Sequence, residues 1–134
     1  MNLILDTHII LWYFGADDKL SGEFLGVIEN PENTIFISHS SLLEISTKIS
    51  LNKLKLHTDW AHFLYLIERC GWNFLPIDTQ DCIQLSTLPH YHGDPFDRII
   101  IVQSLSKNIP VISADKQFDL YGNVRYLPDN KKAL

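Results

Sequence analysis

The sequence lacks any apolar run long enough to cross a membrane. Its longest apolar runs, such as residues 9–14 and 99–102, fall far short of the about 20 residues that a bilayer-spanning helix needs. Residues 1–6 contain neither a basic leader nor a small-residue cleavage site, so we expect no signal peptide. We therefore predict a cytoplasmic protein without a membrane segment.

Cysteine is also scarce, since Cys70 and Cys82 are the only two in 134 residues. They do not form a C-x-x-C pair, and each falls in a segment that the sequence predicts to be helical. The spacing therefore does not indicate a disulfide or a zinc site. We expect both side chains to be small buried apolar groups in a reducing compartment.

Several common catalytic motifs are missing from the chain. It contains no phosphate-binding P-loop, no glycine-rich dinucleotide motif and no G-x-S-x-G motif of serine hydrolases. The six histidines show no H-E-x-x-H or similar ligand spacing, so they do not predict a zinc centre. The segment His90-Tyr91-His92 falls in an expected loop, where contact with a substrate is a secondary hypothesis.

The chain has too few basic residues for a general nucleic-acid binder. Its 11 lysines and arginines are outnumbered by 16 aspartates and glutamates, which gives a net charge of −5. Proteins that bind nucleic acid through bulk charge usually present a basic face. If this protein acts on RNA, a bound divalent cation is needed to offset the phosphate charge locally.

What the sequence does contain is a regular alternation of short apolar strands and longer helical segments. Apolar residues make up 46% and charged residues 20% of the chain, as in an ordinary globular domain, and we expect one domain over residues 1–134. The strands are nearly continuous apolar runs joined by long crossovers, which predicts a parallel α/β sheet of about five strands covered on both faces. The expected strands are residues 2–5, 34–38, 72–77, 111–113 and 124–127. The expected helices are residues 7–14, 22–29, 41–50 (capped by Ser40 or Ser41), 60–70, 79–88 and 95–107.

Four acidic residues fall where such a sheet places its functional site. Asp6 directly follows the first strand, Asp115 follows the strand at 111–113, and Glu44 lies early in the helix after the strand at 34–38. Asp97 lies in the first turn of its helix. The carboxyl ends of parallel strands share one edge of a sheet, so we expect these acids to lie close together.

Convergence of these carboxylates predicts a metal site. Each close pair would repel by roughly 2–3 kcal/mol at about 6 Å and an effective dielectric near 20, so either their pKa values rise or a cation joins them. A set of oxygen ligands without matching histidine or cysteine favours Mg²⁺ or Mn²⁺ over zinc.

Each acid also has a purely structural alternative. Asp6 and Asp115 could cap the helices that follow them, and Glu44 could pair with Lys48 at i,i+4. Asp94 and Asp97 fit an N-cap and an acidic third position on either side of a proline. A non-catalytic α/β binding module would need no more than these roles.

Four motifs then resemble a known family. Residues 3–8 (Leu-Ile-Leu-Asp-Thr-His), 38–45 (Ser-His-Ser-Ser-Leu-Leu-Glu-Ile), 92–98 (His-Gly-Asp-Pro-Phe-Asp-Arg) and 112–118 (Ile-Ser-Ala-Asp-Lys-Gln-Phe) resemble the motifs of PIN domains, in the family's order. The segment 92–98 is the most specific of the four. The chain is most similar to VapC-type toxins of bacterial toxin–antitoxin pairs, which are single PIN domains of about this length.

The resemblance implies a three-layer α/β/α fold and a Mg²⁺- or Mn²⁺-dependent endoribonuclease. It implies that Asp6, Glu44, Asp97 and Asp115 bind the metal and act in catalysis. Thr7 and Ser113 would supply supporting hydroxyls, with Ser113 at a position where the family usually has threonine. It also implies an RNA substrate, a homodimer and an antitoxin partner that blocks the site.

Basic residues outside the acid cluster are candidates for holding the RNA backbone, although each could equally be solvated surface charge. They are Lys48, Lys53, Lys55, Arg98 and Lys116. A PIN nuclease that processes RNA without being a toxin has the same sequence chemistry and stays an alternative. A receiver-like domain is disfavoured, because Asp6 has no adjacent acid and Lys116 follows an aspartate.

Overall fold

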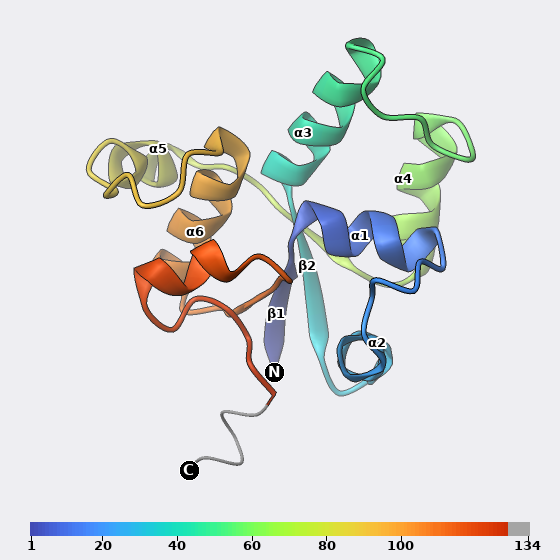
Figure 1. Cartoon of the computed structure of the whole chain (residues 1–134), viewed down its shortest axis with the longest axis horizontal. Coiled ribbons are helices and arrows are strands. Elements are labelled where there is room, and N and C mark those ends of the chain that lie inside the picture. The colour runs from blue at the N-terminus through green and yellow to red at the C-terminus, as the bar shows by residue number, and fades with distance from the viewer. Residues whose placement is uncertain (129–134) are drawn as a thin grey trace.

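The structure, a computed structural model, describes residues 1–128 and is built on a four-stranded parallel sheet (Figure 1). Its strands are β1 (Asn2–Leu5), β2 (Thr34–Ser38), β3 (Asn73–Leu75) and β4 (Val111–Ile112), in the order β3-β2-β1-β4. The parallel sheet predicted from the crossovers is confirmed. The last six residues of the predicted domain lie outside the described residues.

The segment expected as a fifth strand contributes less than a strand. Arg125 forms a single parallel bridge with Val111. The backbone of Val111 hydrogen-bonds to the residues before and after Arg125. The Val111 N–H donates to the Val124 carbonyl at 2.8 Å, and the Val111 carbonyl accepts from the Tyr126 N–H at 2.7 Å. Only the apolar pattern of residues 124–127 resembled a strand. Strand β4 has only two residues, so its edge is too short for residues 124–127 to pair with it as a full strand.

Helices cover both faces of the sheet, as predicted. They are α1 (Thr7–Phe14), α2 (Gly22–Glu29), α3 (His39–Ser50), α4 (Trp60–Arg69), α5 (Thr79–Leu85), α6 (Pro95–Lys107) and the 3₁₀ helix η1 (Lys116–Tyr121). Helix α3 begins at His39, two residues before the expected start at residue 41, because Ser38 is its N-cap and the Ser38 hydroxyl accepts the Ser40 N–H. Within residues 1–128, no helix is both long enough and apolar enough to traverse a bilayer.

The alternating side chains of β1 divide the core into two layers. Leu3 and Leu5 are fully buried against α1, α2 and α4, whereas Ile4 is fully buried on the other face, with Ile100 and Ile101 of α6. Figure 1 shows these two groups of helices on opposite sides of β1 and β2. The predicted three-layer α/β/α arrangement is therefore confirmed.

The prediction that both cysteines are buried is wrong. Cys70 and Cys82 are exposed free thiols. Cys70 is the C-cap residue of α4, and Cys82 lies on the outward face of the short helix α5, where the sequence gives no strong apolar stripe.

Candidate functional site

Asp6 is a buried acid that does not serve as a helix cap. It occupies the N-cap position of α1, but its side chain accepts no hydrogen bond from that helix. Its Oδ2 atom instead accepts from the Ser113 hydroxyl at 2.7 Å, and its backbone N–H pairs with the Ile112 carbonyl of β4. Burial raises the pKa of Asp6, although the Ser113 hydroxyl opposes that rise. The structural alternative for Asp6 is therefore not supported.

Glu44 lies on the second turn of α3 and points into the same region. Its side chain is almost fully buried, and its Oε2 atom lies 2.6 Å from the Lys48 ammonium. The expected i,i+4 pair is thus formed. This hydrogen bond raises the pKa of Lys48, and the negative charges of Asp94 and Asp97 contribute further. Lys48 therefore lies close enough to interact with the charges of Glu44, Asp94 and Asp97.

Two carboxylate oxygens in this cluster have no partner. Among the described residues, Asp6 Oδ1 and Glu44 Oε1 are buried side-chain atoms without a hydrogen bond. An unsatisfied buried polar group costs about 1–3 kcal/mol, and more when it is charged. Buried carboxylate oxygens without a hydrogen-bond partner are the donor type that Mg²⁺ and Mn²⁺ prefer. These residues therefore fit a hard divalent cation.

The negative charges of the other acids in the cluster disfavour ionisation of Asp97. Burial raises its pKa to about 8, with added repulsion from Asp6, Asp94, Glu44 and Asp115. Its neighbour Asp94 has a different task, since Asp94 Oδ1 caps α6 by accepting the N–H groups of Phe96 and Asp97. The structural explanation thus holds for Asp94 but not for the Asp97 side chain.

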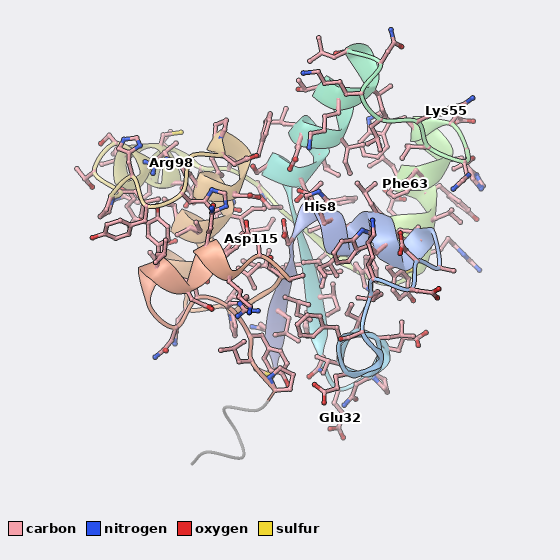
Figure 2. All side chains as sticks on the ribbon, in the orientation of Figure 1. His8, Glu32, Lys55, Phe63, Arg98 and Asp115 are labelled. Carbon is pink, nitrogen blue, oxygen red and sulfur yellow. The ribbon has the colours of Figure 1, made fainter. Side chains whose placement is uncertain are left out.

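Asp115 completes the cluster and also caps the short helix η1. Its Oδ1 atom accepts the Gln117 N–H at 2.9 Å, so the expected cap is present. Its own N–H donates to the Ser113 hydroxyl at 3.0 Å, and that hydroxyl reaches Asp6. Figure 2 shows Asp115 and His8 near the carboxyl end of β1, far from Glu32 at the opposite end of the sheet.

His92 is the residue that sequence reasoning undervalued. Its ring is buried, and its Nε2 atom lies 2.9 Å from Asp115 Oδ2 and 3.2 Å from Asp97 Oδ2. One ligand atom from each of these three residues lies within 4.8 Å of the others. Histidine spacing gave no signal because the partners are acids brought in by α6 and η1. Its place two residues before Asp94, in the most specific motif, was the available indication.

Arg98 holds the loop before α6. It is buried, and its guanidinium donates to the carbonyls of Pro89 at 2.9 Å and Leu88 at 3.0 Å, with a longer contact to the Tyr121 hydroxyl. These contacts use the donors that a phosphate would need, so the structure does not favour Arg98 as an RNA contact. Lys116 is exposed and stays a candidate for contact with the RNA backbone.

Two further hydroxyl contacts support the acid-bearing elements. The Thr7 hydroxyl, which follows Asp6, donates to the Ser41 hydroxyl at 2.9 Å and so joins α1 to α3. The Ser38 hydroxyl donates to Gln103 of α6 at 2.6 Å. Both contacts are buried, and together they fix α3 between α1 and α6, which sets the approach of Glu44 to the other acids.

Comparison with known proteins agrees with this arrangement. The PIN domain family matches residues 3–124, which span all four acids. The chain belongs to the PIN domain family. No curated protein matches it. A chain in the crystal structure of VapBC2 from Rickettsia felis, bound to a DNA fragment from their promoter, shares the PIN fold with a TM-score of 0.70. The two are 17% identical, and the match covers 93% of this chain and 96% of that one.

Proposed function

We propose that this PIN domain is a Mg²⁺- or Mn²⁺-dependent endoribonuclease and the toxin of a toxin–antitoxin pair. The observation that carries the proposal is the pair of buried, unpartnered oxygens, Asp6 Oδ1 and Glu44 Oε1. Asp97, whose pKa is raised to about 8 by burial and in part by the charges of both residues, belongs to the same cluster. PIN domains are generally nucleases, and this chain keeps an acid at each position that the family motifs imply.

The chemistry is hydrolysis of an RNA phosphodiester. A divalent cation held by Asp6, Glu44, Asp97 and Asp115 would activate water and offset charge on the phosphate oxygens. The protein's own contribution is to hold these carboxylates together in a buried site, where electrostatic effects are larger than in water. Asp115 is held by hydrogen bonds at the rim of the cluster.

Substrate binding needs cations outside the acids. The Lys48 side chain is 38% exposed and pairs with Glu44, and we expect it to meet a phosphate at the edge of the cluster. Lys116 is exposed next to Asp115. Phosphate contacts of this kind position a nucleic acid without reading its sequence. The net charge of −5 leaves such local contacts, with the cation, as the source of affinity.

The toxin assignment is supported by the fold shared with a chain of a VapBC complex. It implies a homodimer and an antitoxin that blocks the site. We expect the antitoxin to insert an arginine among Asp6, Glu44 and Asp97, because a guanidinium binds carboxylates in a bidentate fork. A complex in which only apolar partner groups approach Asp97 would contradict this expectation.

A PIN nuclease that processes RNA without being a toxin is the second candidate. The site chemistry would be the same, and a small antitoxin-like reading frame beside the gene would separate the two. A non-catalytic binding module is less well supported, because Asp6 makes no cap hydrogen bond that would explain its burial.

The test is cleavage of total cellular RNA by purified protein with Mg²⁺, with Mn²⁺ and with excess EDTA. We expect cleavage with either ion and none with EDTA. Asp6→Asn should be inactive, whereas Asp18→Asn, at an exposed aspartate in the turn after α1, serves as the control and should cleave normally. Expression of wild type without a partner should slow growth, and Asp6→Asn should not. Equal cleavage in chelator would exclude the metal mechanism.

A further inference from the structure

The hydrogen bonds of His92 fix which of its ring nitrogens carries the proton. Its Nδ1 atom accepts the backbone N–H of Asp94 at 3.1 Å. A neutral imidazole has one N–H and one lone pair, so a lone pair at Nδ1 places the hydrogen on Nε2. Nε2 is the atom that faces Asp115 and Asp97. The ring therefore presents a donor, not a lone pair, to the acid cluster.

This arrangement is the reverse of that around a metal-bound histidine. A ligating histidine offers the lone pair of one nitrogen to the metal and donates its other N–H to a carboxylate, a carbonyl or water. In this chain the second nitrogen meets an N–H, and Asp94 cannot turn its N–H away easily because its side chain caps α6. Proximity of His92 to two acids is therefore not enough to make it a ligand.

We propose that His92 is a positioning residue that holds Asp115 through Nε2–H and is not itself a metal ligand. The inference rests on the proposed metal site and assigns a task to a residue outside its four acids. Asp115 Oδ2 accepts from His92 at 2.9 Å while Oδ1 accepts the Gln117 N–H at 2.9 Å. Both oxygens are thereby oriented by the protein before any cation binds.

The position of the ring is itself secured by η1. The His92 N–H donates to the Tyr121 hydroxyl at 2.9 Å, and that hydroxyl donates to the Pro89 carbonyl at 2.6 Å. The ring packs edge-on against Phe118, with centroids 5.7 Å apart. Contacts on the backbone, the ring and both ring nitrogens leave the imidazole little freedom to turn. The loop thus delivers one N–H donor to a fixed point between Asp97 and Asp115.

The direct experiment is nitrogen-15 NMR of the His92 ring in metal-free wild type and after saturation with Mg²⁺. We expect an unprotonated Nδ1 and a protonated Nε2 in both states. In Mn²⁺-loaded wild type, pulsed EPR should show no directly bound imidazole nitrogen. A hydrogen on Nδ1, or a nitrogen coupling that disappears in His92→Gln, would overturn the proposal. Neither measurement depends on RNA cleavage, so failure of the nuclease assignment is distinguishable.

Two substitutions separate donation from ligation. His92→Gln keeps an N–H donor near the position of Nε2, whereas His92→Leu keeps the volume and removes the donor. By calorimetry, His92→Leu should weaken Mg²⁺ binding by about 10–100-fold, as for other residues that orient metal ligands. His92→Gln should recover most of that loss, and exposed His90→Gln, the control in the same loop, should show none. Equal losses in His92→Gln and His92→Leu would contradict a donor role.

Discussion

The Ser113 hydroxyl lies 2.7 Å from Asp6 Oδ2, although 107 positions separate the two residues. The contact exists because β1 and β4 are neighbouring parallel strands, with Leu5 paired to Ile112. Their carboxyl ends therefore deliver Asp6 and Ser113 to the same point. The same hydroxyl accepts the Asp115 N–H, so one buried oxygen links two acids of the site.

Ser113→Ala should destabilise the protein, because it removes a donor to Asp6 and an acceptor for Asp115 in a fully buried position. Leaving buried partners unsatisfied costs about 1–3 kcal/mol. Ser113→Thr keeps the hydroxyl and should stay close to wild type. Denaturant unfolding measures both, with exposed Ser50→Ala as the control. A Ser113→Ala protein as stable as wild type would show that the hydroxyl link is energetically unimportant.

Asp97 should make the metal-free protein less stable as the pH rises. Its pKa is about 8 in the folded state against 3.8 for the unperturbed group, so the folded state holds this proton more tightly. Stability contributed by the protonated form is complete below about pH 4 and is lost as the pH rises through about 8, by at most about 1.4 kcal/mol per pH unit for one proton.

Asp97→Asn removes that loss, so in EDTA the mutant should melt at a higher temperature than wild type, with the larger difference at pH 8 than at pH 5. Some pH dependence should remain, because burial also raises the pKa of Asp6. Thermal melts across this pH range provide the measurement. If the mutant instead melts at a lower temperature than wild type in EDTA at pH 8, the role of Asp97 is to stabilise the N-terminus of α6 by its negative charge.

Added Mg²⁺ should stabilise wild type by mass action, by about 2.7 kcal/mol at a concentration 100 times the Kd. The gain should be smaller in Asp97→Asn, which has lost one carboxylate. Added Mg²⁺ should also make the stability of wild type less dependent on pH, because the cation favours the ionised acids. Thermal melts of both proteins in Mg²⁺ and in EDTA compare the metal-bound and metal-free forms. The absence of any Mg²⁺ response in wild type would argue against a metal site.

Arg98→Lys should be strongly destabilising despite the conserved charge. A lysine cannot reproduce the planar fork that donates to Leu88 and Pro89, and each hydrogen bond from a charged donor contributes about 1.5–3 kcal/mol. Arg69→Lys, at the exposed end of α4, is the matched control. If Arg98 instead held RNA, the substitution would leave the unfolding free energy unchanged and weaken RNA binding in a salt-dependent way.

The layered architecture and most of the helix and strand bounds can be predicted from the amino-acid pattern alone. Continuous apolar strands separated by long helices allow only a parallel sheet with helices on both faces, and the bounds of β1, α1, β2 and α6 agree with those expected. Local chemistry also sufficed for caps such as Ser21 and Asp94, because a cap is satisfied by its own next turn. The family motifs named the four acids without any knowledge of their distances.

The hydrogen-bond partners of those acids, in contrast, depend on how the helices and strands pack together. No local pattern shows that Asp6 and Glu44 each keep a buried oxygen without a partner among the described residues, since that depends on how α1 and α3 meet above the sheet. The same holds for Arg98, whose exposure depends on where the loop before α6 folds back. His92 is the clearest case: its ring reaches Asp115 across 23 positions, and its proton is placed by a backbone N–H that only the folded loop supplies.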